Sequence, residues 1–151
     1  MPALRFNHME LTMAPGSLDE QARAEIRAFY AEVFEFDALE VPLFGEIGLL
    51  LRTDDETSQF LLLMEQDVHI DSKGYDHLGF LYDSRAEVDD KLELVKKWQQ
   101  RDDRVQIKEY EDLVVGDVTT HAFYFRYLLP IWFDVQVIET AEAPSKRWTF
   151  A

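Results

Sequence analysis

Two short stretches, residues 6–11 (FNHMEL) and residues 75–80 (YDHLGF), decide the fold because they repeat one pattern. Each begins with an aromatic residue, a small polar residue and a histidine, and each then alternates apolar residues with other types. The histidines, His8 and His77, stand 69 residues apart (77 − 8). Self-similarity at a fixed offset is the sequence signature of a repeated structural unit. The stretches therefore predict a chain built from two copies of one module.

The similarity continues into a predicted helix in each half. Ser17 and Glu20 form an S-x-x-E pattern, and so do Ser84 and Glu87. This pattern is the capping box, in which the serine hydroxyl and the glutamate carboxylate bind free N–H groups at a helix start. Apolar residues at helical spacing follow each box, which predicts an amphipathic helix in each module. They are Ala22, Ile26, Phe29 and Val33 in the first helix and Val88, Leu92, Val95 and Trp98 in the second.

Strand-like runs separated by turn residues follow each helix. They lie at residues 39–43, 48–53 and 59–66 in the first half and at 105–113, 121–128 and 132–139 in the second. The order is βαβββ twice, which predicts an α+β fold whose two βαβββ modules form a curved, cleft-enclosing mixed sheet. We expect residues 1–151 to form a single domain, with modules at 4–70 and 71–140 and a C-terminal tail at 141–151. A chance likeness of two unrelated α+β stretches is the alternative, and the coincidence of histidine, capping box and helix face favours the repeat.

Composition narrows the classes of function. The 151 residues include 15 Lys and Arg against 30 Asp and Glu, a net charge of −15, which disfavours nucleic-acid and membrane-surface partners. Cysteine is absent, so disulfides, thiolate catalysis, zinc ribbons and iron–sulfur clusters are excluded. Any metal must be held by histidine, carboxylate, amide or water. No apolar run has the length of a signal peptide or a membrane span, and we expect a cytoplasmic protein.

Strand alternation separates a polar face from an apolar one in the predicted sheet. The histidines of the repeat, His8 and His77, fall on the polar face, as do Glu10, Asp134 and Gln136. If the modules are related by a twofold axis, the two imidazoles face each other and could hold one divalent metal. A lone histidine is more often bonded to a neighbouring strand, but repetition at the same module position favours a small-molecule site.

The closing stretch, residues 130–139 (PIWFDVQVIE), resembles the closing pattern of the vicinal oxygen chelate superfamily. This group contains glyoxalase I, bleomycin-resistance proteins and extradiol dioxygenases. The paired modules with His8 and His77 at their openings strengthen the resemblance, which covers residues 6–139. It implies a small-molecule ligand, a homodimer and a divalent metal (Fe, Mn, Ni or Zn).

The resemblance assigns ligand positions, and this sequence departs from two of them. The superfamily's metal-binding carboxylate lies six residues after the proline, where this chain has Gln136, and the first-module counterpart is Leu62. The implied metal ligands are thus His8, His77 and Gln136. Because a neutral amide donates less charge than a carboxylate, we expect weak or partial metal occupancy.

Three further residues are candidates for catalysis. Glu10 faces the predicted site and could act as a general base or, like Asp134, complete the metal site. The extradiol dioxygenases carry a histidine and a tyrosine before the closing proline, and His121 and Tyr127 resemble these, although Tyr127 stands one residue too close to Pro130.

Two functions of different classes follow. The first is a metal-dependent lyase, isomerase or dioxygenase acting on a small oxygen-bearing substrate, which His8 and His77 favour. The second is a metal-free protein that binds or sequesters a small molecule, as bleomycin-resistance proteins do, which Leu62 and Gln136 favour.

Overall fold

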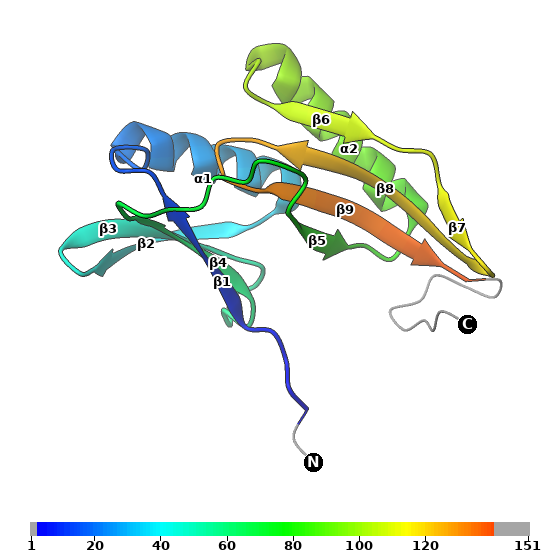
Figure 1. The fold of residues 1–151 in the computed structure, drawn as a ribbon, viewed down its shortest axis with the longest axis horizontal. Coiled ribbons are helices and arrows are strands. Elements are labelled where there is room, and N and C mark those ends of the chain that lie inside the picture. Colours follow the sequence, from blue (N-terminus) through cyan, green and yellow to red (C-terminus); the bar gives the residue numbers. More distant parts are fainter. Residues whose placement is uncertain (1–2, 141–151) are drawn as a thin grey trace. The chain divides into compact units, whose positions relative to one another are not determined.

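The chain forms two compact units, Met1–Asp71 and Ser72–Ala151, in a computed structural model that describes residues 3–140 (Figure 1). The boundary falls within the polar segment 71–74 (DSKG). The tail at 141–151, whose role the sequence leaves open, lies outside the described residues.

The first unit has the order βαβββ. Its sheet is arranged β1-β4-β3-β2, with β1 parallel to β4 and the other pairs antiparallel. Helix α1 packs against β2 and β3. The elements are β1 His8–Met13, α1 Glu20–Phe34, β2 Asp37–Leu43, β3 Glu46–Arg52 and β4 Phe60–Glu65.

The second unit repeats this order with one extra strand. Its sheet is arranged β5-β9-β8-β6, with β5 parallel to β9, and β7 pairs with β8 beside β6. Helix α2 packs against β6, β8 and β9. The elements are β5 His77–Leu81, α2 Arg85–Arg101, β6 Gln106–Glu109, β7 Leu113–Val115, β8 Val118–Arg126 and β9 Trp132–Glu139. The predicted α+β fold of two βαβββ modules is confirmed, with one mixed sheet in each unit.

The strand predicted at 105–113 is wrong in one respect, because it is two strands. Residues 110–112 leave the ladder between β6 and β7. Asp112 lies in this gap between the two paired stretches, and its carboxylate accepts from Arg85 and lies 2.8 Å from His121 Nδ1. The next strand begins earlier than predicted, at Val118.

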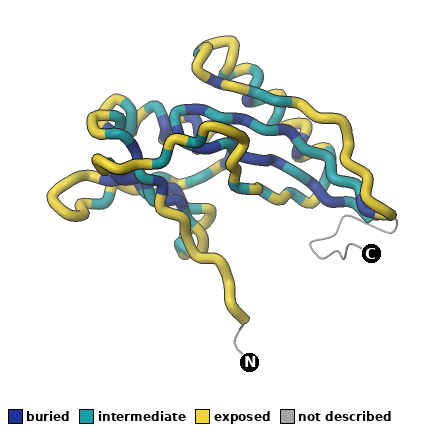
Figure 2. The backbone as a smooth tube through the Cα atoms, in the orientation of Figure 1, coloured by how far each residue is buried: buried dark blue, intermediate teal, exposed yellow. Residues whose placement is uncertain are grey.

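Each core lies where a helix covers its sheet, and Figure 2 shows buried residues along β8 and β9. In the first unit, Ile26, Phe29 and Val33 of the predicted helix face are fully buried. In the second, Val88 and Val95 of α2 are buried. Burying such side chains contributes roughly 1.5–3 kcal/mol each, which fixes the side of each sheet that the helix covers. No helix in the described part of the chain has the length and apolarity needed to cross a bilayer.

Candidate functional site

The second sheet has one face under α2 and one open face. On β9, Phe133, Val135 and Val137 are fully buried on the helix side. Trp132, Asp134 and Gln136 alternate with them and therefore point to the open face. Residues paired across strands share a face, so β5 and β8 also contribute to the open face. Their contributions include His77, Gly79, Ala122 and Tyr124.

His77 opens β5, and a backbone carbonyl fixes its ring. Its Nδ1 lies 2.7 Å from the carbonyl oxygen of Tyr75. Because a carbonyl only accepts, we assign the proton of the neutral ring to Nδ1. The lone pair is then on Nε2, which lies 3.4 Å from the Tyr124 hydroxyl and 3.9 Å from Asp134 Oδ2. His77 thus presents a basic nitrogen to the open face.

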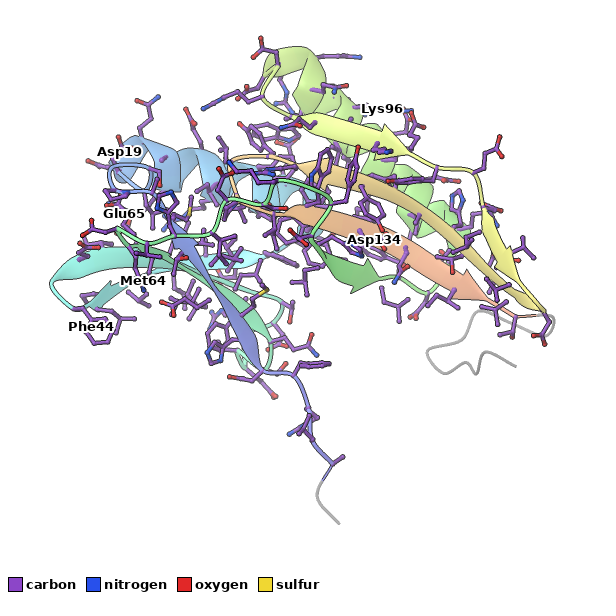
Figure 3. All side chains as sticks on the ribbon, viewed as in Figure 1. Asp19, Phe44, Met64, Glu65, Lys96 and Asp134 are labelled. Carbon is purple, nitrogen blue, oxygen red and sulfur yellow. The ribbon has the colours of Figure 1, made fainter. Side chains whose placement is uncertain are left out.

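Asp134 is the only charged residue among residues 3–140 that is buried, at 7% exposure. Figure 3 labels it on β9. Its Oδ1 has no hydrogen-bond partner in the described part of the chain, and its Oδ2 is too far from His77 Nε2 for a normal hydrogen bond. Desolvation by burial raises its pKa, against smaller opposing effects of His77 and Tyr124. Asp134 is therefore a carboxylate short of positive partners.

Tyr124 completes this group from β8. Burial first, and the negative charge of Asp134 second, raise the pKa of Tyr124 to about 12. Its hydroxyl therefore stays protonated at neutral pH and can donate to His77 Nε2 or to a ligand oxygen.

Aromatic rings surround this group on the same face. The Tyr124 ring lies 4.8 Å from His77, 5.0 Å from Tyr110 and 6.4 Å from Tyr75, centroid to centroid. The Tyr75 ring lies 5.2 Å from Trp132. These distances are typical of interacting aromatic pairs, so the face is lined by flat apolar surface beside a few polar groups.

Gln136, the predicted metal ligand of β9, lies one position further along the open face. It pairs with Leu81 and Ala122, whereas Asp134 pairs with Gly79 and Tyr124. A Cβ built on Gly79 would lie 3.5 Å from Gln136 Nε2. In this register Asp134, which the sequence names only as a secondary candidate, is the side chain that approaches His77. The role of Gln136 as a ligand stays a prediction.

His121, a predicted catalytic residue, lies on the helix side of the sheet. Its Nε2 is 2.7 Å from Asp89 Oδ1 and its Nδ1 is 2.8 Å from Asp112 Oδ1. Desolvation lowers its pKa, but the hydrogen bonds to the two carboxylates outweigh this effect and the net shift is upward. Arg85 binds the same Asp112 at 2.7 Å and holds the pKa of that carboxyl at about 2. His121 is thus part of an ion-pair network between α2 and the sheet.

Tyr127, another predicted catalytic residue, also lies on the helix side of the second sheet. It is buried, and its hydroxyl donates to Asp102 Oδ2 at 2.7 Å. Arg104 holds the same carboxylate, and mainly for that reason the pKa of Asp102 lies well below its usual range. A catalytic role for His121 or Tyr127 stays a prediction, and it would require a site other than the open face.

The first unit carries the remaining predicted residues. His8 is exposed, stacks on Phe60 with centroids 4.8 Å apart, and has its Nδ1 2.7 Å from Asn7 Oδ1. Glu10 is exposed and lies opposite Leu62, just as Gly79 lies opposite Asp134 in the second unit. Leucine cannot bind a metal, so this part of the first unit lacks a counterpart of Asp134. The pairing of His8 with His77 stays a prediction.

Across residues 3–140, no three His, Cys, Asp or Glu side chains gather closely enough to form a metal site by themselves. The open face offers His77 Nε2 and the Asp134 carboxylate, a donor pair that suits a divalent cation with other positions left to water or ligand oxygens.

Comparison with known proteins gives a uniform answer on the fold. No family model matches the sequence, and no curated protein matches it. Several solved structures, however, have a fold similar to that of this chain. A lactoylglutathione lyase from Agrobacterium tumefaciens has a TM-score of 0.59 at 20% identity, covering 90% of this chain and 95% of that one. The fosfomycin resistance protein FosX from Listeria monocytogenes has a TM-score of 0.58 at 17% identity, covering 89% and 90%.

An integron cassette protein of V. cholerae is similar to the same extent, with a TM-score of 0.56 at 20% identity over 90% of this chain and 96% of that one. At these identities the likeness concerns the fold. The resemblance drawn from the repeat and the closing stretch is confirmed at that level: this chain has the paired βαβββ fold of the vicinal oxygen chelate superfamily.

Proposed function

We propose that this chain is a glyoxalase-like protein that binds a small oxygen-bearing molecule on the open face of its second sheet. In this proposal His77 and Asp134 hold a divalent metal. The observation that carries it is the buried Asp134 carboxylate, whose Oδ1 has no described partner and whose Oδ2 lies 3.9 Å from His77 Nε2. Burying an uncompensated charge is costly, and a cation bound between these two groups would offset the cost.

The imidazole is also arranged as a metal-binding histidine usually is. Such histidines donate their second ring N–H to a carbonyl or carboxylate, which orients the ring. His77 does this through Nδ1 to the Tyr75 carbonyl. Two protein ligands leave positions open for ligand oxygens, as a catalytic site requires. His8 and Gln136, the other predicted ligands, would add to this pair.

The chain's own groups would orient the ligand. The Tyr124 hydroxyl, protonated at neutral pH, would donate to a ligand oxygen. The rings of Tyr75 and Trp132 would contact its apolar part and exclude water. A divalent metal supplies a Lewis acid that polarises ligand oxygens. Lyase, isomerase and dioxygenase chemistry all remain compatible with this arrangement.

A metal-free binding protein is the second candidate. The aromatic lining of the open face favours it, as do Gln136 and Leu62 at positions where the superfamily carries carboxylates. In that case Asp134 would meet a cationic or hydrogen-donating group of the ligand.

Titration of Mn, Fe, Ni and Zn into the full chain, freed of chelators, tests the metal. We expect Asp134→Asn and His77→Ala to weaken binding about tenfold or more, because each removes one protein ligand. His69→Ala is a matched control. Like His77, His69 forms a hydrogen bond with the backbone carbonyl two residues before it, but it belongs to the first unit. Gln136→Glu should tighten binding if Gln136 is a ligand.

Wild-type protein that binds none of these metals would contradict the metal proposal, and so would Asp134→Asn binding as tightly as wild type. The metal-free candidate would then stand, and ligand binding followed by Trp132 fluorescence would test it.

A further inference from the structure

Lys108 places a positive charge on the open face. Its Nζ lies 3.0 Å from the Tyr75 hydroxyl, 4.2 Å from the centroid of the Tyr75 ring and 5.1 Å from that of Tyr110. It forms no ion pair with any carboxylate in residues 3–140. Lys96 on α2 is different, because it pairs with two glutamates at 3.3 and 3.6 Å. In a chain with twice as many acidic as basic residues, such an ammonium is unusual.

The contacts of Lys108 also hold its ammonium in place before any ligand arrives. Two aromatic rings and a hydroxyl restrict a side chain that otherwise loses much rotamer entropy on binding. The hydrogen bond to Tyr75 is the main cause of a raised Lys108 pKa, so the charge is fully present at neutral pH. Lys108 is therefore a preorganised anion-binding group.

Strand register sets the position of this group relative to His77 and Asp134. Lys108 on β6 pairs with Tyr124 on β8, Tyr124 pairs with Asp134 on β9, and Asp134 pairs with Gly79 on β5. The four residues thus form one row across the sheet. Neighbouring strands lie about 4.8 Å apart, so Lys108 and Asp134 are separated by about 10 Å, with the Tyr124 ring between them.

We infer that the open face takes a planar aromatic monocarboxylate, with its carboxylate on the Lys108 ammonium, its ring against Tyr124 and a neutral oxygen-bearing end toward His77. This inference rests on the proposed function and adds the class of ligand. The ammonium selects an anion, and the rings of Tyr75, Tyr110 and Tyr124 select a flat molecule. When no metal is bound, the Asp134 charge at the far end of the row disfavours a second anionic group on the ligand.

Equilibrium binding of 4-hydroxybenzoate and of its neutral analogue 4-hydroxybenzamide to the full chain tests the inference. The two probes share ring and hydroxyl and differ in charge. We expect wild type to prefer the carboxylate about tenfold, because a charge-assisted contact exceeds a neutral one by about that factor. The preference should weaken as salt is added. Lys108→Gln should remove the preference, and Lys108→Arg should retain most of it.

Lys91→Gln is the matched control, since Lys91 also lies near a tyrosine ring, 5.8 Å from that of Tyr82, but belongs to α2. It should leave the preference unchanged. Equal affinity of wild type for both probes would overturn the inference, as would the absence of binding at millimolar concentration or an equal loss of both affinities in Lys108→Gln. Metal titration of the same proteins separates the two proposals. A preference for the carboxylate without metal binding would support the inference and contradict the metal site. Metal binding without that preference would support the metal site and contradict the inference.

Discussion

Asp134 is the residue on which the candidate site depends. Its neighbours on the open face are an imidazole, a phenol and aromatic rings, which stabilise a carboxylate less than water does. Asp102 and Asp112, whose pKa values are lowered, are different because arginines hold them in the charged form. A buried carboxylate whose raised pKa is only partly offset by its neighbours, and whose Oδ1 has no described hydrogen-bond partner, is typical of a functional site.

Replacing Asp134 by Asn should stabilise the metal-free protein at neutral pH. The folded-state pKa of Asp134 is raised, so the folded wild type binds a proton more tightly than the unfolded chain. Its free energy of unfolding must then fall as pH rises from about 4 through the raised pKa. Asn does not titrate, so we expect Asp134→Asn to be more stable by about 1 kcal/mol above this window, with the advantage shrinking toward acid pH.

Urea unfolding in the presence of chelator, from about pH 4 to about pH 8, measures this difference. Asp103→Asn, which removes an exposed carboxylate, should show no such dependence. Lower stability of Asp134→Asn at neutral pH would mean that the carboxylate is already compensated, and the argument for a bound cation would fail.

At the scale of elements, the helix starts show what local sequence determines. Ser84 caps α2 as predicted, accepting from the N–H of Glu87 at 3.2 Å, and the Glu87 carboxylate accepts from the N–H of Asp83. The same pattern at Ser17 is wrong as a prediction of a cap. The cap of α1 is Asp19, which accepts from Ala22 at 2.8 Å, while Ser17 donates to a carbonyl in the preceding turn. Two residues within reach can cap one helix, and sequence alone does not choose between them.

Packing between β3 and β4 leaves no room for a side chain at Gly48. A Cβ there would overlap the Met64 sulfur, labelled in Figure 3, and would lie 2.9 Å from the carbonyl oxygen of Leu63. A side chain can move but the β4 backbone cannot easily do so. We therefore expect Gly48→Ala to lower the free energy of unfolding by about 1–3 kcal/mol.

Gly74→Ala is the matched control, because its new Cβ would meet no atom within 4 Å. Chemical denaturation of both variants at neutral pH checks the pair. Equal stability of the two variants would show that β3 and β4 are less tightly packed than described.

At the scale of the whole molecule, the repeat in the sequence was sufficient to predict the fold, because each copy carries its own strand, helix and strand pattern. The site was predictable only in part. Spacing from Pro130 selects Gln136, but the register of β5 against β9 brings Asp134 to His77. Register depends on packing between strands more than 50 residues apart in sequence, and an offset of two positions is invisible to local patterns. For the same reason, the sequence did not predict Lys108 on β6 and Tyr110 in the following loop as site residues.

Self-association is the last property that the sequence predicts, and the edge of the second sheet supports it as a proposal. β7 is three residues long, and among the described strands it pairs only with β8. Its side chains are apolar and exposed, with Val114 at 63%. An open apolar edge is a template for pairing with another chain, and natural proteins cover or charge such edges. We expect a homodimer whose interface includes β7, formed against the repulsion of a net charge of −15 and therefore strengthened by salt.

Sedimentation equilibrium at micromolar concentration, in low and high salt, tests this proposal. Val114→Lys should weaken dimerisation about tenfold or more, because it places a charge in the apolar edge. Val68→Lys adds the same charge at a loop position that is 88% exposed, and it should leave the equilibrium close to wild type. A strict monomer at all salt concentrations would contradict the dimer. If both variants dimerise as wild type does, the association uses another surface, because a lysine buried in the β7 edge could not be neutral in energy.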